Sequence, residues 1–169
     1  MTIYAIGCMH FGHENIIRKA NRPFSCLEEM EQTMVDNWNK TVKDKDTVLV
    51  IGDFSWKGDR PESYEKRLRG NLVRIHGNHD PDDWGVDYHS LKYMKRKFIC
   101  FHYPIEEWDG WFGGSIHLHA HTHKPKLASA PRRFNVGVDA TGFRPISLDE
   151  ILAHPNSDRM AGMREELES

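Results

Sequence analysis

The sequence predicts an α/β fold in which a half with alternating strands and helices is followed by a strand-rich half that forms a further sheet. Short apolar, β-branched runs recur along the chain. Helical patterns separate the first three of these runs, as in a sheet of parallel strands. With 169 residues and no repeat, linker or low-complexity segment, we expect a single domain over residues 1–154 and a polar tail over residues 155–169.

Six runs are expected to be strands, because each is short, apolar and rich in β-branched residues. They cover residues 3–6, 47–51, 72–75, 98–101, 116–120 and 134–138. Helix starts are predicted where a serine precedes a glutamate by three residues, as at Ser25 with Glu28 and at Ser147 with Glu150. A further helix is expected over about residues 61–70, between a proline and a glycine.

The composition excludes several classes of function. The 23 Lys and Arg residues face 25 Asp and Glu residues, so the net charge of −2 provides no positive field for non-specific binding of duplex nucleic acid. No apolar stretch reaches the length of a membrane span, and the N-terminus lacks the apolar core of a signal peptide. Three widely spaced cysteines argue against a disulfide framework. We therefore expect a cytoplasmic protein without membrane contact.

Polar side chains follow four of the predicted strands at the point where each strand ends. They are Cys8, His10 and His13 after the first strand, Asp53 after the second, His76, Asn78, His79 and Asp80 after the third, and His102 after the fourth. The carboxyl ends of parallel strands meet at one edge of a sheet, where ligands bind. We therefore expect these segments to form one site.

Residues 115–123 carry four histidines at alternate positions. Alternate side chains of an extended strand point to the same face. His117, His119, His121 and His123 are therefore expected on one face. A metal ion binds neutral imidazoles and removes the repulsion that four protonated rings would suffer.

The order of these residues resembles the motifs of the calcineurin-like metallophosphoesterases, in particular the small stand-alone bacterial and phage members. The family motifs run D-x-H, G-D, G-N-H-D/E, H and G-H-x-H. In this sequence they correspond to Cys8-x-His10, Gly52-Asp53, Gly77-Asn78-His79-Asp80, His102 and His121-x-His123. Cys8 stands where the family has Asp, and Ala120 where it has Gly. The resemblance implies a four-layer αββα sandwich of two mixed β-sheets flanked by helices.

The resemblance also implies two divalent metal ions, either Zn, Fe or Mn. One would be held by Cys8, His10, Asp53 and His123, and the other by Asp53, Asn78, His102 and His121. The implied reaction is hydrolysis of a small, nucleotide-like phosphodiester or phosphomonoester by attack of a metal-bridging hydroxide on phosphorus. His79 would contact the phosphoryl group or protonate the leaving oxygen, and Asp80 would orient His79.

The cysteine at position 8 leaves two interpretations open. A thiolate keeps the charge of the aspartate it replaces, and Zn–S bonds of about 2.3 Å offset the shorter side chain. As a ligand, Cys8 would favour Zn or Fe over Mn. Alternatively, the exchange has removed a metal site, and the chain is a catalytically impaired binding or scaffold module.

Four other residues also have two interpretations each. His13 and Arg22 are candidate contacts to a substrate phosphate, with helix capping or surface pairing as the alternative. His117 and His119 precede the last motif, and we expect them in the core or behind the ligands rather than on a metal.

Overall fold

The computed structural model of the protein describes residues 1–56 and 61–158. Along the chain the elements are β1 (Ile3–Ile6), α1 (Asn15–Lys19), α2 (Leu27–Thr41), β2 (Thr47–Ile51), α3 (Pro61–Glu65), β3 (Asn71–Ile75), β4 (Tyr88–Tyr93), β5 (Arg96–Phe101), β6 (Ile116–His119), β7 (Ala128–Ala130), β8 (Arg133–Asn135), α4 (Val138–Thr141), β9 (Ile146–Ser147), α5 (Leu148–Ala153) and the 3-10 helix η1 (Pro155–Ser157).

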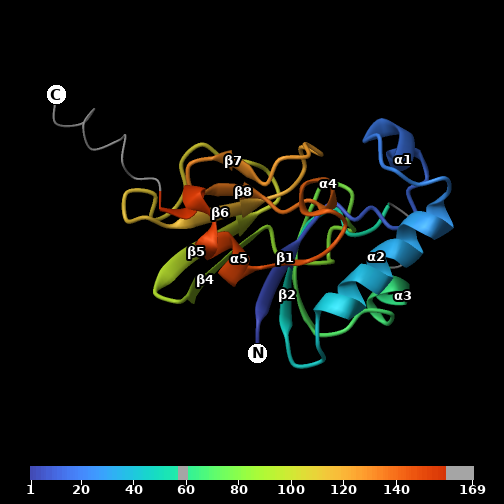
Figure 1. Ribbon diagram of the computed structural model, residues 1–169, viewed down its shortest axis with the longest axis horizontal. Coiled ribbons are helices and arrows are strands. Elements are labelled where there is room, and N and C mark those ends of the chain that lie inside the picture. Colours follow the sequence, from blue (N-terminus) through green and yellow to red (C-terminus); the bar gives the residue numbers. More distant parts are fainter. Residues whose placement is uncertain (57–60, 159–169) are drawn as a thin grey trace.

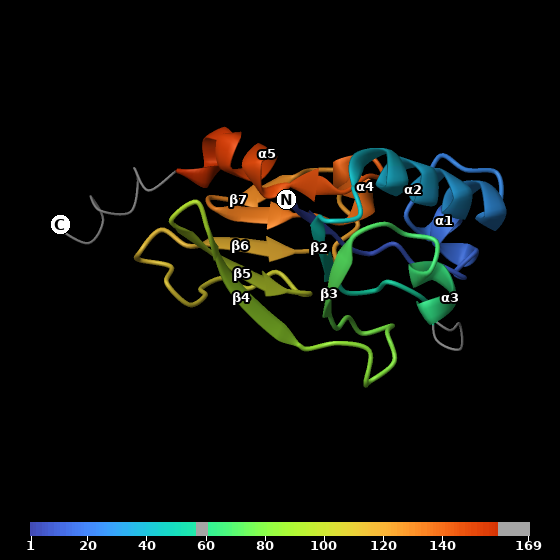
Figure 2. The same cartoon turned by 90° about the horizontal axis from the view of Figure 1, so that it is seen from below.

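The strands form two mixed sheets. The first has the order β3-β2-β1-β9, with β1, β2 and β3 parallel and β9 antiparallel. The second has the order β4-β5-β6-β8-β7, with a parallel centre and an antiparallel strand at each edge. Figure 1 shows α2 beside β1 and β2. Figure 2 shows α1, α2 and α3 on one side of the first sheet and the second sheet on its other side. The predicted fold class, two mixed sheets flanked by helices, is confirmed.

Two apolar cores hold these layers together. Between the sheets, alternate residues such as Ala5, Leu49, Phe98 and Leu118 are fully buried. On the outer face of the first sheet, the other alternate residues, such as Ile6, Val48 and Val50, pack against α2, whose largest buried side chain is Trp38. Both faces of β1 and β2 are therefore covered, which explains why these strands read as continuous apolar runs.

All six predicted strands are present, although the run at 134–138 ends as a strand at Asn135. The sequence analysis missed β4, β7 and β9. β4 alternates between exposed and half-buried positions, and β7 and β9 have only three and two residues, so none of them forms an apolar run.

The two predicted capping boxes have different outcomes. The box of Ser147 and Glu150 is confirmed, because each residue bonds the backbone N–H of the other at 2.9–3.1 Å. The helix start at Ser25 is wrong: α2 begins at Leu27, and the Ser25 N–H donates to Glu29 at 2.7 Å. The helix predicted over residues 61–70 ends early, at Glu65.

The predicted polar tail differs at its start. Residues 155–157 form η1, in which Ser157 is buried, and Arg96 bonds both the Ser157 carbonyl and Asp158. The rest of the predicted tail lies outside the described residues. Among residues 1–56 and 61–158, no helix combines the length and apolar character that crossing a membrane requires.

Candidate metal centre

The loops that follow β1, β2, β3 and β6 meet at one end of the two sheets and surround a pocket of about 250 Å³. Its lining residues are His10, His13, Ile16, Lys19, Ala20, Asp53, Trp56, His79, His121 and His123. The predicted site residues His10, His13, Asp53, His79, His121 and His123 therefore share one cavity. This convergence is the one expected from the carboxyl ends of parallel strands.

The Asp53 carboxylate lies between two histidine rings. Its Oδ2 atom is 3.5 Å from His10 Nε2 and 3.3 Å from His102 Nε2. Its Oδ1 atom accepts the backbone N–H of His79 at 2.9 Å. His102 Nε2 is also 3.2 Å from the amide oxygen of Asn78. One carboxylate oxygen of Asp53 thus has ring nitrogens of two different histidines within 3.5 Å.

The Cys8 thiol lies next to the same carboxylate. Two groups have ligand atoms within 4.8 Å of one another, namely Cys8 with His10 and His123, and Cys8 with Asp53 and His102. Cys8 is 1% exposed, and its sulfur accepts the backbone N–H of His121 at 3.0 Å. The thiol is therefore common to both candidate ligand groups.

The backbone of the site is left-handed at five predicted ligands. The φ angles are 52° at Cys8, 55° at His10, 53° at Asp53, 63° at His121 and 50° at His123. Residues other than glycine rarely adopt positive φ, which costs about 1–3 kcal/mol each and clusters at functional sites. The chain therefore carries strain where the candidate ligands lie.

Two glycines allow the loops to approach each other closely. The Cys8 N–H donates to the Gly52 carbonyl at 2.9 Å, which joins the first loop to the second. A Cβ atom on Gly52 would lie 2.3 Å from His102 Nδ1. One on Gly77 would lie 2.3 Å from the backbone nitrogen of Asp53. Any larger residue at either position would displace a candidate ligand.

Asp80 holds the second and third loops together. Its carboxylate accepts the backbone N–H groups of residues 53–55 at 2.7, 2.8 and 3.3 Å, and that of Gly77 at 2.9 Å. These four bonds make Asp80 a positioning residue for the loop of the Asp53 ligand. The predicted action of Asp80 on the His79 ring stays a prediction.

Hydrogen bonds orient two of the histidines. The Nδ1–H of His102 donates to the Ile51 carbonyl at 3.1 Å, and the Nδ1–H of His123 donates to Asp139 at 2.9 Å. Both acceptors bind a proton on Nδ1, so the neutral rings keep their Nε2 lone pairs for a ligand. Metal-binding histidines are commonly held in this way by a carboxylate or a carbonyl.

Arg22 lies beneath the site rather than in it. Its guanidinium is bound to Asp139 at 2.9 Å, to the Cys8 carbonyl at 2.7 Å and to the Met9 carbonyl at 3.1 Å. The residue is only 5% exposed, and all three of its nitrogens are engaged. This corrects the prediction that Arg22 contacts a substrate phosphate: it supports the loop that carries Cys8.

His10 supplies a direct test of whether the residues suit a metal. Both of its ring nitrogens are buried without a hydrogen-bond partner among the described residues. Burial lowers the pKa of His10 to about 2, so the ring is neutral and able to bind a cation. Burial raises the pKa of Asp53, but hydrogen-bond contacts with the His102 ring and with the His79 backbone N–H outweigh it and lower that pKa to about 2. A neutral ring without a partner beside an ionised carboxylate fits a divalent metal ion.

Part of the pocket wall is aromatic. The His13 ring stacks on Trp56, with centroids 3.7 Å apart, and the His79 ring lies 4.7 Å from Trp56. Burial lowers the pKa of His13 to about 4. His13 therefore lines the cavity as a neutral ring, and its contact with a substrate stays a prediction.

Sequence reasoning missed two residues of the site, Trp56 and Asp139. Trp56 follows the Gly52-Asp53 motif by three residues, so an aromatic side chain in the same loop was a usable signal. Asp139 follows the apolar run at 134–138, but nothing in that segment indicated that it would reach His123 and Arg22.

The four alternate histidines do not share one face, which corrects that expectation. β6 ends at His119, and His121 has a left-handed backbone. His117 and His119 are fully buried. His117 bonds the Ile99 carbonyl at 3.1 Å, and His119 bonds the Ala120 carbonyl at 2.9 Å. The alternation predicted for an extended strand therefore stops at His119.

Comparisons with known proteins point to one family. A family profile described as calcineurin-like phosphoesterase matches residues 1–128. An uncharacterized protein of Methanocaldococcus jannaschii is 37% identical over 159 residues, which cover 89% of each chain. The gene 66 protein of Mycobacterium phage L5 is 28% identical over 193 residues, covering 85% of this chain and 88% of its own.

Solved structures share the fold. A protein of unknown function from Aquifex aeolicus superposes with a TM-score of 0.73 at 24% identity, over 89% of this chain and 97% of its own. Vps29 from Entamoeba histolytica, solved in complex with zinc, has a TM-score of 0.51 at 18% identity, over 81% of this chain and 73% of its own.

Proposed function

The chain belongs to the calcineurin-like phosphoesterase family, and on that basis we propose that it is a metal-dependent hydrolase of a small, nucleotide-like phosphodiester or phosphomonoester. One observation carries the proposal: the Asp53 carboxylate lies between the rings of His10 and His102, with the Cys8 thiol beside it. These donors come from three separate loops, and His10, Asp53 and His102 are polar side chains that are buried together.

Two divalent ions would share the donors of this cluster. The first set is Cys8, His10, Asp53 and His123, and the second is Asp53, Asn78, His102 and His121. When bound, the ions lower the pKa of water and offset the negative charge of the phosphoryl oxygens. The soft sulfur of Cys8 favours Zn or Fe over Mn.

The residues around the ligands bind and orient the substrate. His79 lies in the cavity wall, where its ring can hold a proton for the oxygen that leaves phosphorus. His13 and Trp56 form a stacked pair on the same side, suited to the flat face of a base or an aryl group. Asp80 keeps the backbone of Asp53 in position through its four hydrogen bonds.

The second candidate function is a binding or scaffold module with an impaired metal site. The observation that favours it is the cysteine at position 8, because burial raises the pKa of that thiol well above its usual value. A thiol that keeps its proton is a poor ligand. Against this candidate, the chain retains every other predicted ligand, with the rings of His102 and His123 already oriented.

Hydrolysis of chromogenic substrates separates the two candidates. Bis(4-nitrophenyl) phosphate and 4-nitrophenyl phosphate are supplied with Mn, Zn or Fe, and the native chain is compared with Asp53→Asn. The proposal predicts turnover by the native chain that is lost in Asp53→Asn. Absence of turnover with every metal, in a chain that is folded by circular dichroism, would support the module.

A further inference from the structure

A second pocket of about 270 Å³ lies outside the candidate metal centre, on the loop that carries two of its ligands. Its lining residues are Pro104, His119, Thr122, Lys124, Lys126, Ser129, Arg133 and Asn135. Thr122 lies between the candidate ligands His121 and His123 in the chain. The pocket and the metal centre therefore share one loop.

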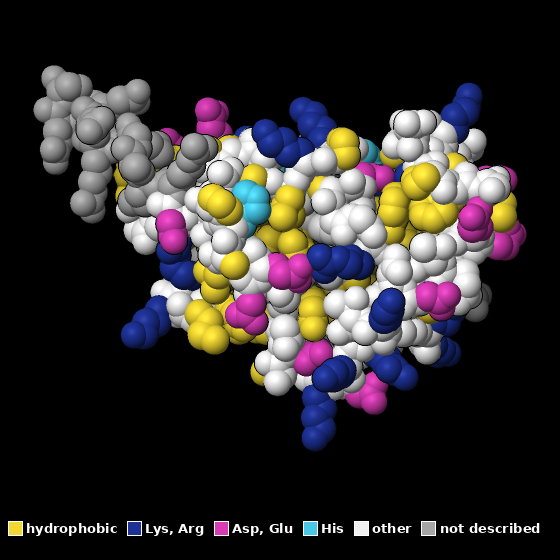
Figure 3. All heavy atoms as spheres, in the orientation of Figure 1, with side chains coloured by type: hydrophobic (Ala, Val, Ile, Leu, Met, Phe, Trp, Pro, Cys, Tyr) yellow, Lys and Arg dark blue, Asp and Glu magenta, His cyan; other side chains and the backbone are white. Residues whose placement is uncertain are grey.

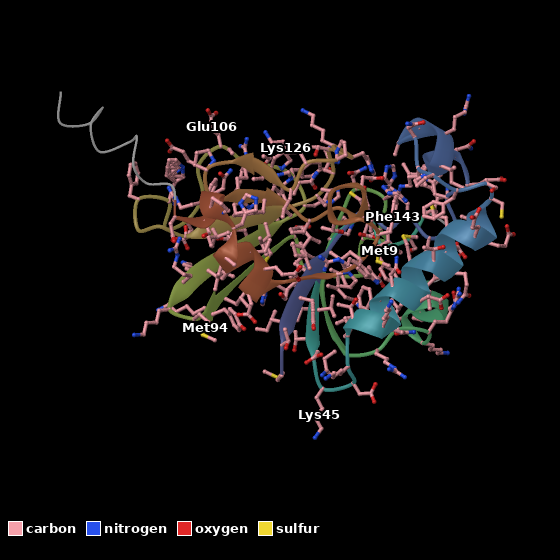
Figure 4. All side chains as sticks on the ribbon, viewed as in Figure 1. Met9, Lys45, Met94, Glu106, Lys126 and Phe143 are labelled. Atoms are coloured by element: carbon pink, nitrogen blue, oxygen red, sulfur yellow. The ribbon has the colours of Figure 1, made fainter. Side chains whose placement is uncertain are left out.

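The charge of this pocket is positive. Its lining includes Lys124, Lys126 and Arg133, and no carboxylate of the described residues lines it. None of these three cations has an ion pair within 4.0 Å in the described part of the chain. Figure 3 shows Lys and Arg side chains along the upper edge of the molecule, where Figure 4 labels Lys126. The chain has a net charge of −2, so this local excess is not a property of the whole surface.

The polar floor of the pocket is already fixed by hydrogen bonds. The buried Asn135 amide donates to the Lys124 carbonyl at 2.9 Å and to Thr122 Oγ1 at 3.3 Å. Arg133 donates to the Ile105 carbonyl at 3.0 Å and to Ser129 Oγ at 3.3 Å. Neutral acceptors thus hold the guanidinium in place and leave its charge uncompensated. A site formed in advance binds an anion with little further ordering.

We infer that this basic pocket binds a second phosphate group of the same substrate molecule whose phosphoester bond is hydrolysed at the metal centre. Phosphate oxygens accept hydrogen bonds from Lys and Arg, and paired cations favour a doubly charged monoester over a singly charged diester. The substrate class is then a short nucleotide with a phosphate in addition to the scissile one. This inference rests on the proposed function. A single pocket on a negatively charged chain suits a small ligand better than a duplex.

Substrates that differ only in a terminal phosphate test the inference by kinetics. Thymidine dinucleotides without a terminal phosphate, with a 5′-phosphate and with a 3′-phosphate are compared on the metal-loaded native chain. We expect one phosphorylated form to have a KM about tenfold lower than the unphosphorylated form, since hydrogen bonds to charged groups are the stronger class. The phosphorylated form with the lower KM shows which end of the nucleotide reaches the pocket.

The double variant Lys124→Gln/Lys126→Gln removes the charge at exposed side chains, so the fold is preserved. It should abolish the KM advantage of the phosphorylated form and leave kcat/KM for bis(4-nitrophenyl) phosphate unchanged. The matched control is Lys45→Gln/Lys92→Gln, which changes the net charge equally at other exposed lysines. Figure 4 places Lys45 at the edge of the molecule opposite Lys126. Equal KM values for all three native substrates, or an advantage that survives the Lys124/Lys126 exchange, would overturn the inference.

A binding measurement keeps this test separate from the proposed function. Isothermal titration calorimetry measures the affinity of the phosphorylated dinucleotide for the full chain in the presence of a chelator. We expect binding about tenfold weaker in the Lys124/Lys126 variant than in the Lys45/Lys92 control. If the native chain shows no hydrolysis and the two variants still differ in affinity, the proposed function is wrong but the pocket is a phosphate site. If the difference is absent, the pocket is not a phosphate site.

Discussion

The two halves of the histidine-rich segment have the same spacing and opposite roles. His117 and His119 lie on β6, where both are fully buried and bonded to backbone carbonyls. His121 and His123 follow the end of the strand with left-handed backbones, and both line the metal-site pocket. We call His117 and His119 the strand pair and His121 and His123 the loop pair. The strand pair is packed in the interior, whereas the loop pair lines the cavity.

Backbone conformation, rather than residue type, therefore separates these two pairs of histidines. When both ring nitrogens are hydrogen-bonded to carbonyl or hydroxyl groups, neither is left to bind a metal. A ring that a positive φ turns toward a cavity can present a lone pair there. The same left-handed conformation occurs at Cys8, His10 and Asp53, so five of the seven candidate ligands share it, whereas Asn78 and His102 do not.

Truncation of a loop histidine has the largest expected effect on function. His123→Ala removes a candidate ligand and should lower kcat/KM for bis(4-nitrophenyl) phosphate about a thousandfold, since a metal supplies several kcal/mol to the transition state. Metal per chain, measured by mass spectrometry, should fall. The unfolding free energy of chelator-treated protein should fall by only about 1 kcal/mol, because the part-exposed ring loses its hydrogen bond to Asp139 while Asp139 keeps its bond to Arg22. Unchanged metal content would refute the role of the loop pair.

Truncation of a strand histidine should have the opposite profile. His117→Ala leaves a cavity and removes the partner of the Ile99 carbonyl and the Ile105 N–H. The unfolding free energy should fall by about 3 kcal/mol in urea titrations. Metal content per folded chain should match that of the native protein. A loss of metal here with stability intact would invert the comparison.

Asp139 connects His123 to Arg22. Asp139→Asn keeps the shape but weakens the bond to His123 Nδ1 and the ion pair to Arg22. Metal affinity should fall about 10- to 100-fold, the usual effect of exchanging a residue that orients a ligand. Competition with a chromogenic chelator measures it. Asp44→Asn, at an exposed carboxylate, is the matched control and should leave affinity unchanged.

Acid should lower the unfolding free energy through the buried ring of His117. Burial lowers the pKa of His117 to about 4, below the ordinary value of 6.5. Between pH 6.5 and 4 the unfolded chain binds a proton that the folded chain does not, so stability falls as the pH falls through this window. The native chain should lose about 2 kcal/mol more than His117→Ala over that range. Urea titrations of both proteins in chelator at pH 6.5 and pH 4 measure the difference. An equal loss of unfolding free energy in the native chain and in His117→Ala would contradict the prediction.

The sequence predicted the parallel strands and the gathering of their polar ends, because apolar runs and strand-end polarity are local signals. It also predicted the Ser147 capping box, but the same spacing at Ser25 failed because Cys26 lies at the helix N-cap. The prediction that Arg22 contacts a substrate phosphate was wrong because its actual partners, Cys8 and Asp139, come from other segments of the chain. Such tertiary contacts leave no pattern in the residues nearby.

The backbone conformation after the end of β6 could not be predicted from the sequence either. Continuation of β6 would have set all four histidines on one face, and the left-handed turn at His121 prevents it. The positions of β4 and β9 were also unpredictable, since an edge strand with half-exposed residues and a strand of two residues have no apolar run.

Metal content per chain shows directly whether Cys8 and its neighbours form a working metal site. Protein purified without chelators is analysed for Zn, Fe and Mn, with Cys8→Asp beside it and phosphodiesterase activity on the same samples. We expect about two Zn or Fe per native chain, turnover, and metal–sulfur scattering at about 2.3 Å in X-ray absorption spectra. One metal or none in the native chain, with both metals and turnover appearing only in Cys8→Asp, would contradict it.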